Sequence, residues 1–235
     1  MELCSEELYN EIAARLQSWC STKCRKYPWR EKVDPYAILL AEFLLQRTKA
    51  ETVAKFFVQV LSRYKDIREL ASARKEELNE FFSKLGLLYR AERILETAAM
   101  IVERYGDVIP CDMNQLLKLR GVGVYMASAI LNFGCGIPTS VIDKNVMRVM
   151  NRLFNVTKES VGREIILKLY KYGDHKALAY ALIDLGATIC TEPPRCSECP
   201  LDSICAKHPL RKNEWRMLRK DLRCGKVIIY EQPVK

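Results

Sequence analysis

Four cysteines near the C-terminal end constrain the local fold more than any other feature of the chain. They fall within sixteen residues with the spacing C-x5-C-x2-C-x5-C, and they are Cys190, Cys196, Cys199 and Cys205. The residues between them are rich in proline and acidic side chains and cannot build an apolar core. Four thiolates this close together can bind a single metal centre, and that metal would then order the segment.

The cysteine spacing alone leaves three interpretations open. An iron–sulfur cluster takes four cysteine ligands. A zinc site usually takes two C-x2-C pairs separated by a longer spacer, whereas this segment has a single tight pair. Disulfides or free thiols are the third possibility, since intracellular proteins of hyperthermophiles do carry disulfides. The other six cysteines form no comparable group and are expected to be buried or incidental: Cys4, Cys20, Cys24, Cys111, Cys135 and Cys224.

Length and charge restrict the class of protein. A chain of 235 residues that is 49% hydrophobic can bury the core of one large or two small domains. No apolar stretch reaches the roughly 18 residues that span a membrane, and the acidic start lacks the order of a signal peptide. An intracellular location, in the cytoplasm or nucleoid, is therefore expected. The net charge of +9 favours a polyanionic partner. The two histidines, His175 and His208, lie in no triad-like setting.

The apolar residues recur with a helical period along almost the whole chain, so the sequence predicts an all-α fold. Only Lys226–Tyr230 alternates like a short strand, and the residues from Cys205 to Arg223 are strongly basic. The predicted helices are Glu6–Cys20, Tyr36–Arg47, Glu51–Tyr64, Ile67–Leu70, Lys75–Lys84, Ala91–Tyr105, Met113–Leu119, Tyr125–Phe133, Lys144–Leu153, Lys158–Lys171 and His175–Cys190.

A Gly-x-Gly turn separates two of these helices. Gly121 and Gly123 permit tight backbone geometry and leave amide groups available at the start of the second helix. Amides at a helix start bind phosphate through hydrogen bonds and the helix dipole, without reading base sequence. A plain helical hairpin that needs glycine to turn is the alternative.

Two carboxylates stand out. Glu42 lies inside the apolar run Ala37–Leu45, where burial would raise its pKa and make it a proton donor near neutrality. It could instead face solvent in a narrow stripe shared with Lys49. Asp143 directly precedes a predicted helix, as an N-cap does, and such a position can also hold a carboxylate rigidly at a cleft. Cleavage of a glycosidic bond needs two carboxylates with different roles.

Five segments in order make the chain resemble the helix-hairpin-helix DNA glycosylase superfamily, in its iron–sulfur branch. They are Pro28–Arg30 with Asp34–Tyr36, Glu42–Thr48, Leu119–Tyr125, Ile142–Arg148 and the cysteine run. The resemblance implies a [4Fe–4S] cluster on the four cysteines and a monomer that binds double-stranded DNA with a mismatched or damaged base. It implies two helical domains, 34–136 and 1–33 plus 137–205, a basic tail at 206–235, and DNA across the cleft with the target nucleotide flipped.

The resemblance also assigns roles to single residues. Glu42 matches the pocket acid and Asp143 the catalytic aspartate, while Tyr125 stands where endonuclease III-like members have a lysine nucleophile. A phenol cannot form a Schiff base, so the enzyme is expected to leave an abasic site without cutting the strand. Tyr125 could alternatively be an aromatic plug that closes the hairpin. The residues expected to contact DNA are Gln46, Arg47, Tyr89, Gly121, Gly123, Lys144 and Arg195.

Two monofunctional subfamilies fit. Glu42 with Tyr125 resembles the archaeal thymine-DNA glycosylases, which remove T or U opposite G, and a prokaryotic source is expected. Leu44–Thr48 and Asn145–Arg148 look equally like adenine glycosylases, which remove A opposite oxidised guanine. Those enzymes usually add a large C-terminal domain, whereas thirty residues follow Cys205 here, which favours the mismatch enzyme. A non-catalytic helical DNA-binding module is the third possibility. The first cysteine loop has five residues where the family commonly has six, and Lys144 stands where adenine glycosylases often have glycine.

Overall fold

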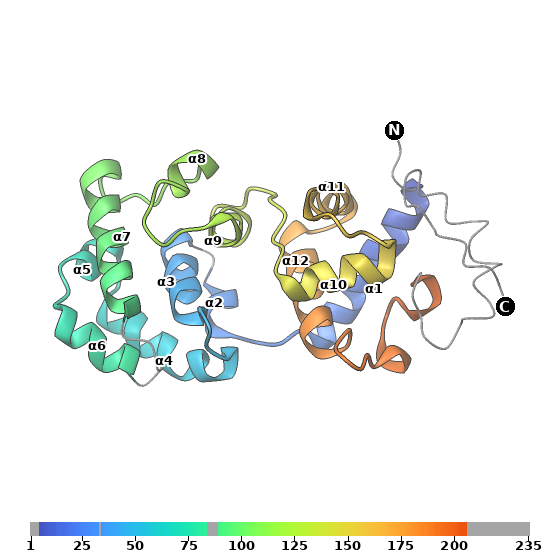
Figure 1. Ribbon diagram of the computed structural model, residues 1–235, viewed down its shortest axis with the longest axis horizontal. Helices are drawn as coiled ribbons and strands as arrows, with labels where there is room; N and C mark the ends of the chain where they lie inside the picture. The colour runs from blue at the N-terminus through green and yellow to red at the C-terminus, as the bar shows by residue number, and fades with distance from the viewer. Residues whose placement is uncertain (1–4, 33, 84–88, 206–235) are drawn as a thin grey trace. The chain divides into compact units, whose positions relative to one another are not determined.

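A computed structural model describes residues 5–32, 34–83 and 89–205 (Figure 1). Helices joined by short loops make up this part of the chain, which contains no strand. The expected all-α fold is therefore confirmed. The strand expected at Lys226–Tyr230 and the basic tail lie outside the described residues. Within the described ranges, no helix is both long and apolar enough to cross a membrane.

The chain folds into two compact units. The first, here called the terminal unit, takes the described residues up to Arg25 and those from Ser140 onward. The second, the central unit, spans Lys26–Thr139. The chain thus passes between the units twice, at Arg25–Lys26 and at Thr139–Ser140.

The buried helix α3 forms the middle of the central unit. It spans Pro35–Leu45 and begins cleanly because the Asp34 side chain accepts a hydrogen bond from the Ala37 amide, with proline in the first turn. Seven of its eleven residues are buried, and it packs against five neighbouring elements. The other helices of this unit are α2 (Pro28–Glu31), α4 (Ala50–Arg63), α5 (Ile67–Ala71), α6 (Lys75–Ser83), α7 (Tyr89–Tyr105), α8 (Met113–Leu116) and α9 (Val124–Ala129).

Helix α9 continues into a π-helical turn, η1, at Ile130–Gly134. Its last residue lies so close to the start of α3 that a Cβ atom on Gly134 would stand 2.7 Å from Cα of Pro35. A side chain there would force the two elements apart, so glycine allows the second hairpin helix to approach α3.

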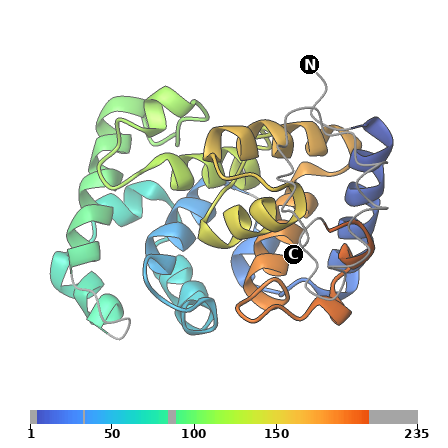
Figure 2. The same cartoon turned by 45° about the vertical axis from the view of Figure 1, so that its right-hand side comes forward.

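The terminal unit brings the two ends of the described chain together. Helix α12 (His175–Thr188) packs against both α1 (Glu6–Lys23) and α10 (Lys144–Phe154), as Figures 1 and 2 show. The remaining elements are α11 (Glu159–Leu169) and the 3-10 turns η2 (Tyr170–Tyr172), η3 (Cys196–Glu198) and η4 (Asp202–Ile204). Because α1 packs against α12, the N-terminal helix belongs to the same unit as the cysteine run, although the two are far apart in the sequence.

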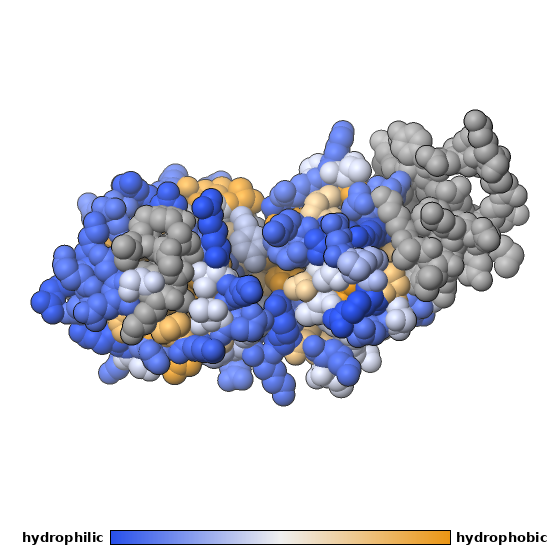
Figure 3. All heavy atoms as spheres, turned by 60° about the horizontal axis from the view of Figure 1, so that its bottom comes forward, coloured by the Kyte–Doolittle hydropathy of each residue, from blue (hydrophilic) through white to orange (hydrophobic). Residues whose placement is uncertain are grey.

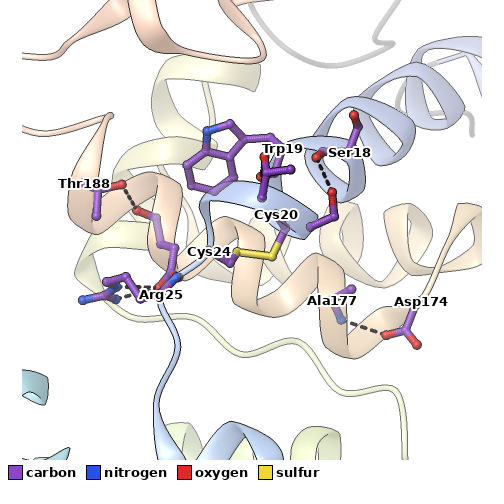
Figure 4. Close-up of a disulfide and its surroundings, with 11 residues drawn as sticks. Ser18, Trp19, Cys20, Cys24, Arg25, Asp174, Ala177 and Thr188 are labelled. Atoms are coloured by element: carbon purple, nitrogen blue, oxygen red, sulfur yellow. Dashed lines mark hydrogen bonds and ion pairs between the residues drawn. A yellow bond between two sulfur atoms is a disulfide. The ribbon is translucent and has the colours of Figure 1, made fainter.

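A buried ion pair joins the end of α1 to α12. Asp184 is fully buried, and its carboxylate accepts hydrogen bonds from the Arg25 amide (2.7 Å), Nε (2.9 Å) and an Nη atom (2.7 Å). A disulfide between Cys20 and Cys24 closes the last turn of α1 just before this pair (Figure 4). The chain therefore leaves the terminal unit from a firmly held point.

Two disulfides correct the expectation that the scattered cysteines are incidental. Besides Cys20–Cys24, Cys111 pairs with Cys135 in the central unit, with Cα atoms 5.8 Å apart. Cys4 and Cys224 lie outside the described residues. The four clustered cysteines take part in no disulfide, so that interpretation of the cluster is excluded in this structure.

Hydrophilic side chains cover most of the face shown in Figure 3. The large apolar side chains that are exposed in the described residues lie on different elements, and they are Val58, Val108, Leu117, Val124, Ile137 and Leu167. A polar surface on a chain with a net charge of +9 suits an anionic partner.

Candidate active site and cysteine cavity

Asp143 caps the N-terminus of α10. One of its oxygens, Oδ1, accepts a hydrogen bond from the Val146 amide at 2.7 Å, and the other, Oδ2, accepts one from the Asn145 side chain at 3.0 Å. The residue is partly exposed. The capping interpretation is therefore right, and it is compatible with the catalytic one, because capping holds a partly exposed carboxylate in one orientation.

A chain of hydrogen bonds links Asp143 to the first clustered cysteine. Oδ1 of Asn145 accepts from Arg148 at 3.2 Å, and Arg148 donates to the carbonyl oxygens of Cys190 (2.6 Å) and Gly186 (2.6 Å). A Cβ atom on Gly186 would lie 2.8 Å from the Asn145 carbonyl oxygen, so glycine allows this close approach of α12. Asn145 and Arg148 were noted in the sequence only as part of the Ile142–Arg148 segment, and their supporting contacts were not predicted.

Glu42 and Tyr125 both belong to the central unit, on α3 and α9, and these two helices are in contact. Glu42 is partly exposed, although Ala41 and Phe43 on either side of it are buried. Glu42 is therefore neither fully buried, as one expectation had it, nor fully exposed to solvent, as the alternative had it. Lys49, which that alternative placed in the same stripe, is exposed. Tyr125 is the second residue of α9 and is also partly exposed.

The Gly-x-Gly turn forms between α8 and α9, and its two glycines differ. Gly121 has φ of +80°, and an added Cβ would lie 3.3 Å from the ring of Phe43, so this position needs glycine. Gly123 caps α9, and a Cβ there would meet nothing within 4 Å. The buried Thr97 hydroxyl binds the carbonyl oxygen of Arg120 and so holds the turn against α7. The turn is rigid, and the space beside Gly123 is open.

The segment after α3 has a strained backbone. Gln46 is the C-cap of α3, and the exposed Arg47 that follows has φ of +55°, a left-handed conformation that non-glycine residues seldom adopt. Such strain persists where the surrounding structure imposes it, often at functional sites. Lys144 is the first residue of α10 and is exposed. Tyr89 begins α7, and its side chain lies outside the described residues.

The four clustered cysteines line one cavity of the terminal unit, together with Arg152, Ile189, Pro194 and Asp202. Arg152 donates to the carbonyl oxygens of Cys190 (3.1 Å) and Thr191 (2.8 Å) and lies 3.4 Å from Sγ of Cys190. Arg148 and Arg152 are four residues apart and therefore face the same segment from one side of α10. The four-residue spacing of these arginines could be read from the sequence, but the carbonyl oxygens of Cys190 and Thr191 to which they donate could not.

Burial raises the pKa of the Cys199 thiol to about 12, and the neighbouring cysteines add to this effect while the Leu201 backbone opposes it. Burial also raises the pKa of Cys196, whereas Arg152 lowers it. A cation in the cavity would favour the thiolate forms that burial opposes. Four thiols that open on one cavity and form no disulfide are a donor set that fits an iron–sulfur cluster. The four thiols share this cavity, but within the described ranges no three His, Cys, Asp or Glu side chains are grouped closely enough to hold a single metal ion, so the thiols do not form a closed ligand set.

Arg195 supports the shortened first cysteine loop from within. Its Nε donates to the carbonyl oxygen of Thr188 at 3.1 Å, and an Nη atom lies 3.4 Å from Glu198. Its side chain is 52% exposed. It therefore holds the loop against the end of α12 while part of its guanidinium faces solvent.

Two helices, α8 and α9, joined by a turn that contains Gly121 and Gly123 are typical of a helix-hairpin-helix protein. The model of the HhH-GPD superfamily base excision DNA repair proteins matches residues 40–172, and the chain belongs to this superfamily. The expected membership is thus confirmed.

The chain is similar to thymine-DNA glycosylases and adenine DNA glycosylases. The thymine-DNA glycosylase of Aeropyrum pernix is 39% identical over 191 residues, which cover 76% of this chain and 85% of that protein. The human adenine DNA glycosylase is 32% identical and covers 86% of this chain and 41% of its own length. Among solved structures, a thermostable thymine-DNA glycosylase has a TM-score of 0.79 and 28% identity, covering 86% of this chain and 97% of its own.

Proposed function

We propose that this chain is a monofunctional DNA glycosylase that removes thymine or uracil opposite guanine. The observation that carries the proposal is the 39% identity to a thymine-DNA glycosylase along 85% of that protein. The adenine glycosylases remain the second candidate, since one of them is 32% identical across 86% of this chain. Double-stranded DNA is the substrate of either enzyme.

Asp143 would act on the sugar. When the N-glycosidic bond breaks, positive charge develops on the deoxyribose, and a carboxylate beside it stabilises this charge and activates water. The hydrogen bonds from Val146 and Asn145 hold the carboxylate in one orientation. A fixed carboxylate meets the transition state without first reorganising.

Glu42 would protonate the departing base. It is presented by α3, most of whose residues are buried, and is itself only partly exposed. Tyr125, on the neighbouring α9, would line the same pocket. Its phenol has no amine to form a Schiff base with the sugar, so the strand would remain intact at the abasic product.

The remaining assignments concern DNA. Gln46 and Tyr89 would enter the base stack, and the amides at Gly121 and Gly123 would bind a phosphate of the backbone. The exposed Arg47, Lys144 and Arg195 would contact phosphates as well. The open space beside Gly123 supports the amide assignment, because no side chain obstructs the approach of an anion.

We further propose that Cys190, Cys196, Cys199 and Cys205 hold a [4Fe–4S] cluster. Such a cluster would order the segment and take no part in breaking the glycosidic bond. The cysteines support this because all four line one cavity and none is in a disulfide.

A panel of four duplexes tests the proposed function. Duplexes with T:G, U:G, A:G and A:8-oxoguanine pairs are incubated with the protein and then with alkali, which cleaves the strand at an abasic site. We expect cleavage at T and U opposite G. Cleavage at adenine alone would establish the second candidate, and no cleavage in any duplex would support a non-catalytic DNA-binding module.

A metal analysis tests the cluster. The purified protein is expected to be brown, with broad visible absorption, about four iron atoms per chain and inorganic sulfide. Cys199→Ser is expected to lose most of the iron and to lower the Tm, whereas Cys111→Ser should keep the colour because Cys111 pairs with Cys135 instead. A colourless protein that contains one zinc ion per chain would contradict the assignment.

A further inference from the structure

The three residues before Asp143 have no regular secondary structure, yet all are buried. Ser140, Val141 and Ile142 are 3%, 1% and 5% exposed, and Ser140 is where the chain enters the terminal unit. The helix that follows this segment, α10, begins only at Lys144. Groups outside this segment must therefore satisfy its backbone and fix its path.

Arg163 on α11 supplies the strongest of these contacts. One Nη atom donates to the carbonyl oxygen of Ser140 at 2.9 Å and approaches its hydroxyl at 3.3 Å. The other edge of the guanidinium donates to Glu159 at 3.1 and 2.6 Å. The Arg163 side chain is 24% exposed, so the contact is largely shielded from water. A guanidinium held by a carboxylate on one edge presents its other edge in a fixed direction.

Residues near Arg163 in the sequence pack against the same segment, Ser140–Ile142. Gly162 is buried, and a Cβ atom there would lie 3.7 Å from the Ile142 side chain, so α11 packs closely on the residue before Asp143. Tyr170 follows α11 and is buried, and burial raises its pKa while the nearby Val141 backbone opposes that rise. The segment is thus held along its length by α11 and the turn that follows.

We propose that Arg163 is a positioning residue for Asp143. By holding the Ser140 carbonyl it sets where the chain enters α10, and so it sets the position of the carboxylate three residues later. This inference rests on the proposed function, in which Asp143 acts on the sugar. A displacement of about 1 Å at a reacting group can lower a rate by roughly 10²-fold, so a distant arginine can affect catalysis without contacting DNA.

The test compares Arg163→Gln, Arg163→Lys and Ser140→Ala with the parent on a T:G duplex. Single-turnover excision rates are measured alongside the Kd for a duplex carrying a non-cleavable abasic analogue. Arg163→Gln is expected to lower the excision rate by roughly 10- to 100-fold with the Kd unchanged. Arg163→Lys should recover part of the rate, because an ammonium group still donates to the carbonyl. Ser140→Ala should stay near the parent, because it removes only the hydroxyl contact.

Hydrogen exchange gives a second readout that needs no DNA. Arg163→Gln is expected to speed exchange of the Val141–Asp143 amides and to leave α1 and α12 unchanged. Parent-like excision or parent-like exchange in Arg163→Gln would overturn the proposal. If the parent excises no base, the proposed function fails, and with it the role of Arg163 in catalysis; exchange then reports only whether Arg163 holds the segment.

Discussion

Asp143→Asn is expected to lower the single-turnover rate of base excision by roughly 10²- to 10⁴-fold. Asparagine caps a helix about as well as aspartate, so the Val146 amide keeps a partner and α10 should remain intact. The amide carries no negative charge, however, and neither stabilises a cationic sugar nor takes a proton from water. Excision rates, duplex affinity and circular dichroism are measured on the same preparation.

Asp174→Asn is the matched control for this substitution. Asp174 caps α12 in the same unit, and its Oδ1 accepts from the Ala177 amide at 2.7 Å, as Asp143 does from Val146. We expect this variant to excise at the parental rate. Equal losses in both variants would show that capping accounts for the effect, and a parental rate in Asp143→Asn would remove this carboxylate from the mechanism.

Arg25→Ala is expected to destabilise the terminal unit by about 3–5 kcal/mol. The substitution keeps the amide that binds Asp184 but removes both guanidinium contacts, leaving a fully buried carboxylate without its cation. Removing one partner of a buried pair costs more than the pair contributes, because the desolvated charge stays behind. Urea unfolding followed by circular dichroism measures the change in the free energy of unfolding.

Arg68→Ala provides the comparison. Arg68 pairs with Asp107 in the central unit, but its side chain is 72% exposed, so solvent screens the pair. The expected loss of stability is small, because a solvent-exposed ion pair contributes little. A loss of that size in Arg25→Ala as well would mean that the Asp184 carboxylate finds other partners or water when the guanidinium is removed.

Local patterns in the sequence predicted the parts of the site that depend on neighbouring residues. The helical period located nearly every helix, and an aspartate directly before an apolar helix predicted the cap at Asp143. Gly121 was recognised as a turn residue, and its positive φ confirms this. These features follow from backbone preferences that act within a few residues.

Contacts between distant segments could not be predicted in this way. Arg148 and Cys190 are 42 residues apart, and Arg25 and Asp184 are 159 apart. A charged residue in a helix gives no sign of which remote carbonyl or carboxylate it will meet once the helices pack. The same limit applies to the Cys111–Cys135 disulfide, because cysteine spacing permits many pairings. Long-range packing, and not local preference, selects these partners.

Identification of the released base and of the state of the strand tests whether this protein is a monofunctional thymine-DNA glycosylase. A T:G duplex is incubated with the protein, the free base is identified by mass spectrometry, and the strand is resolved without alkali and after borohydride. We expect free thymine, an intact strand that alkali then cleaves, and no covalent protein–DNA adduct. Strand cleavage without alkali, or a borohydride-trapped adduct, would contradict the assignment of Tyr125 in a monofunctional enzyme. Absence of free thymine would contradict the proposed substrate.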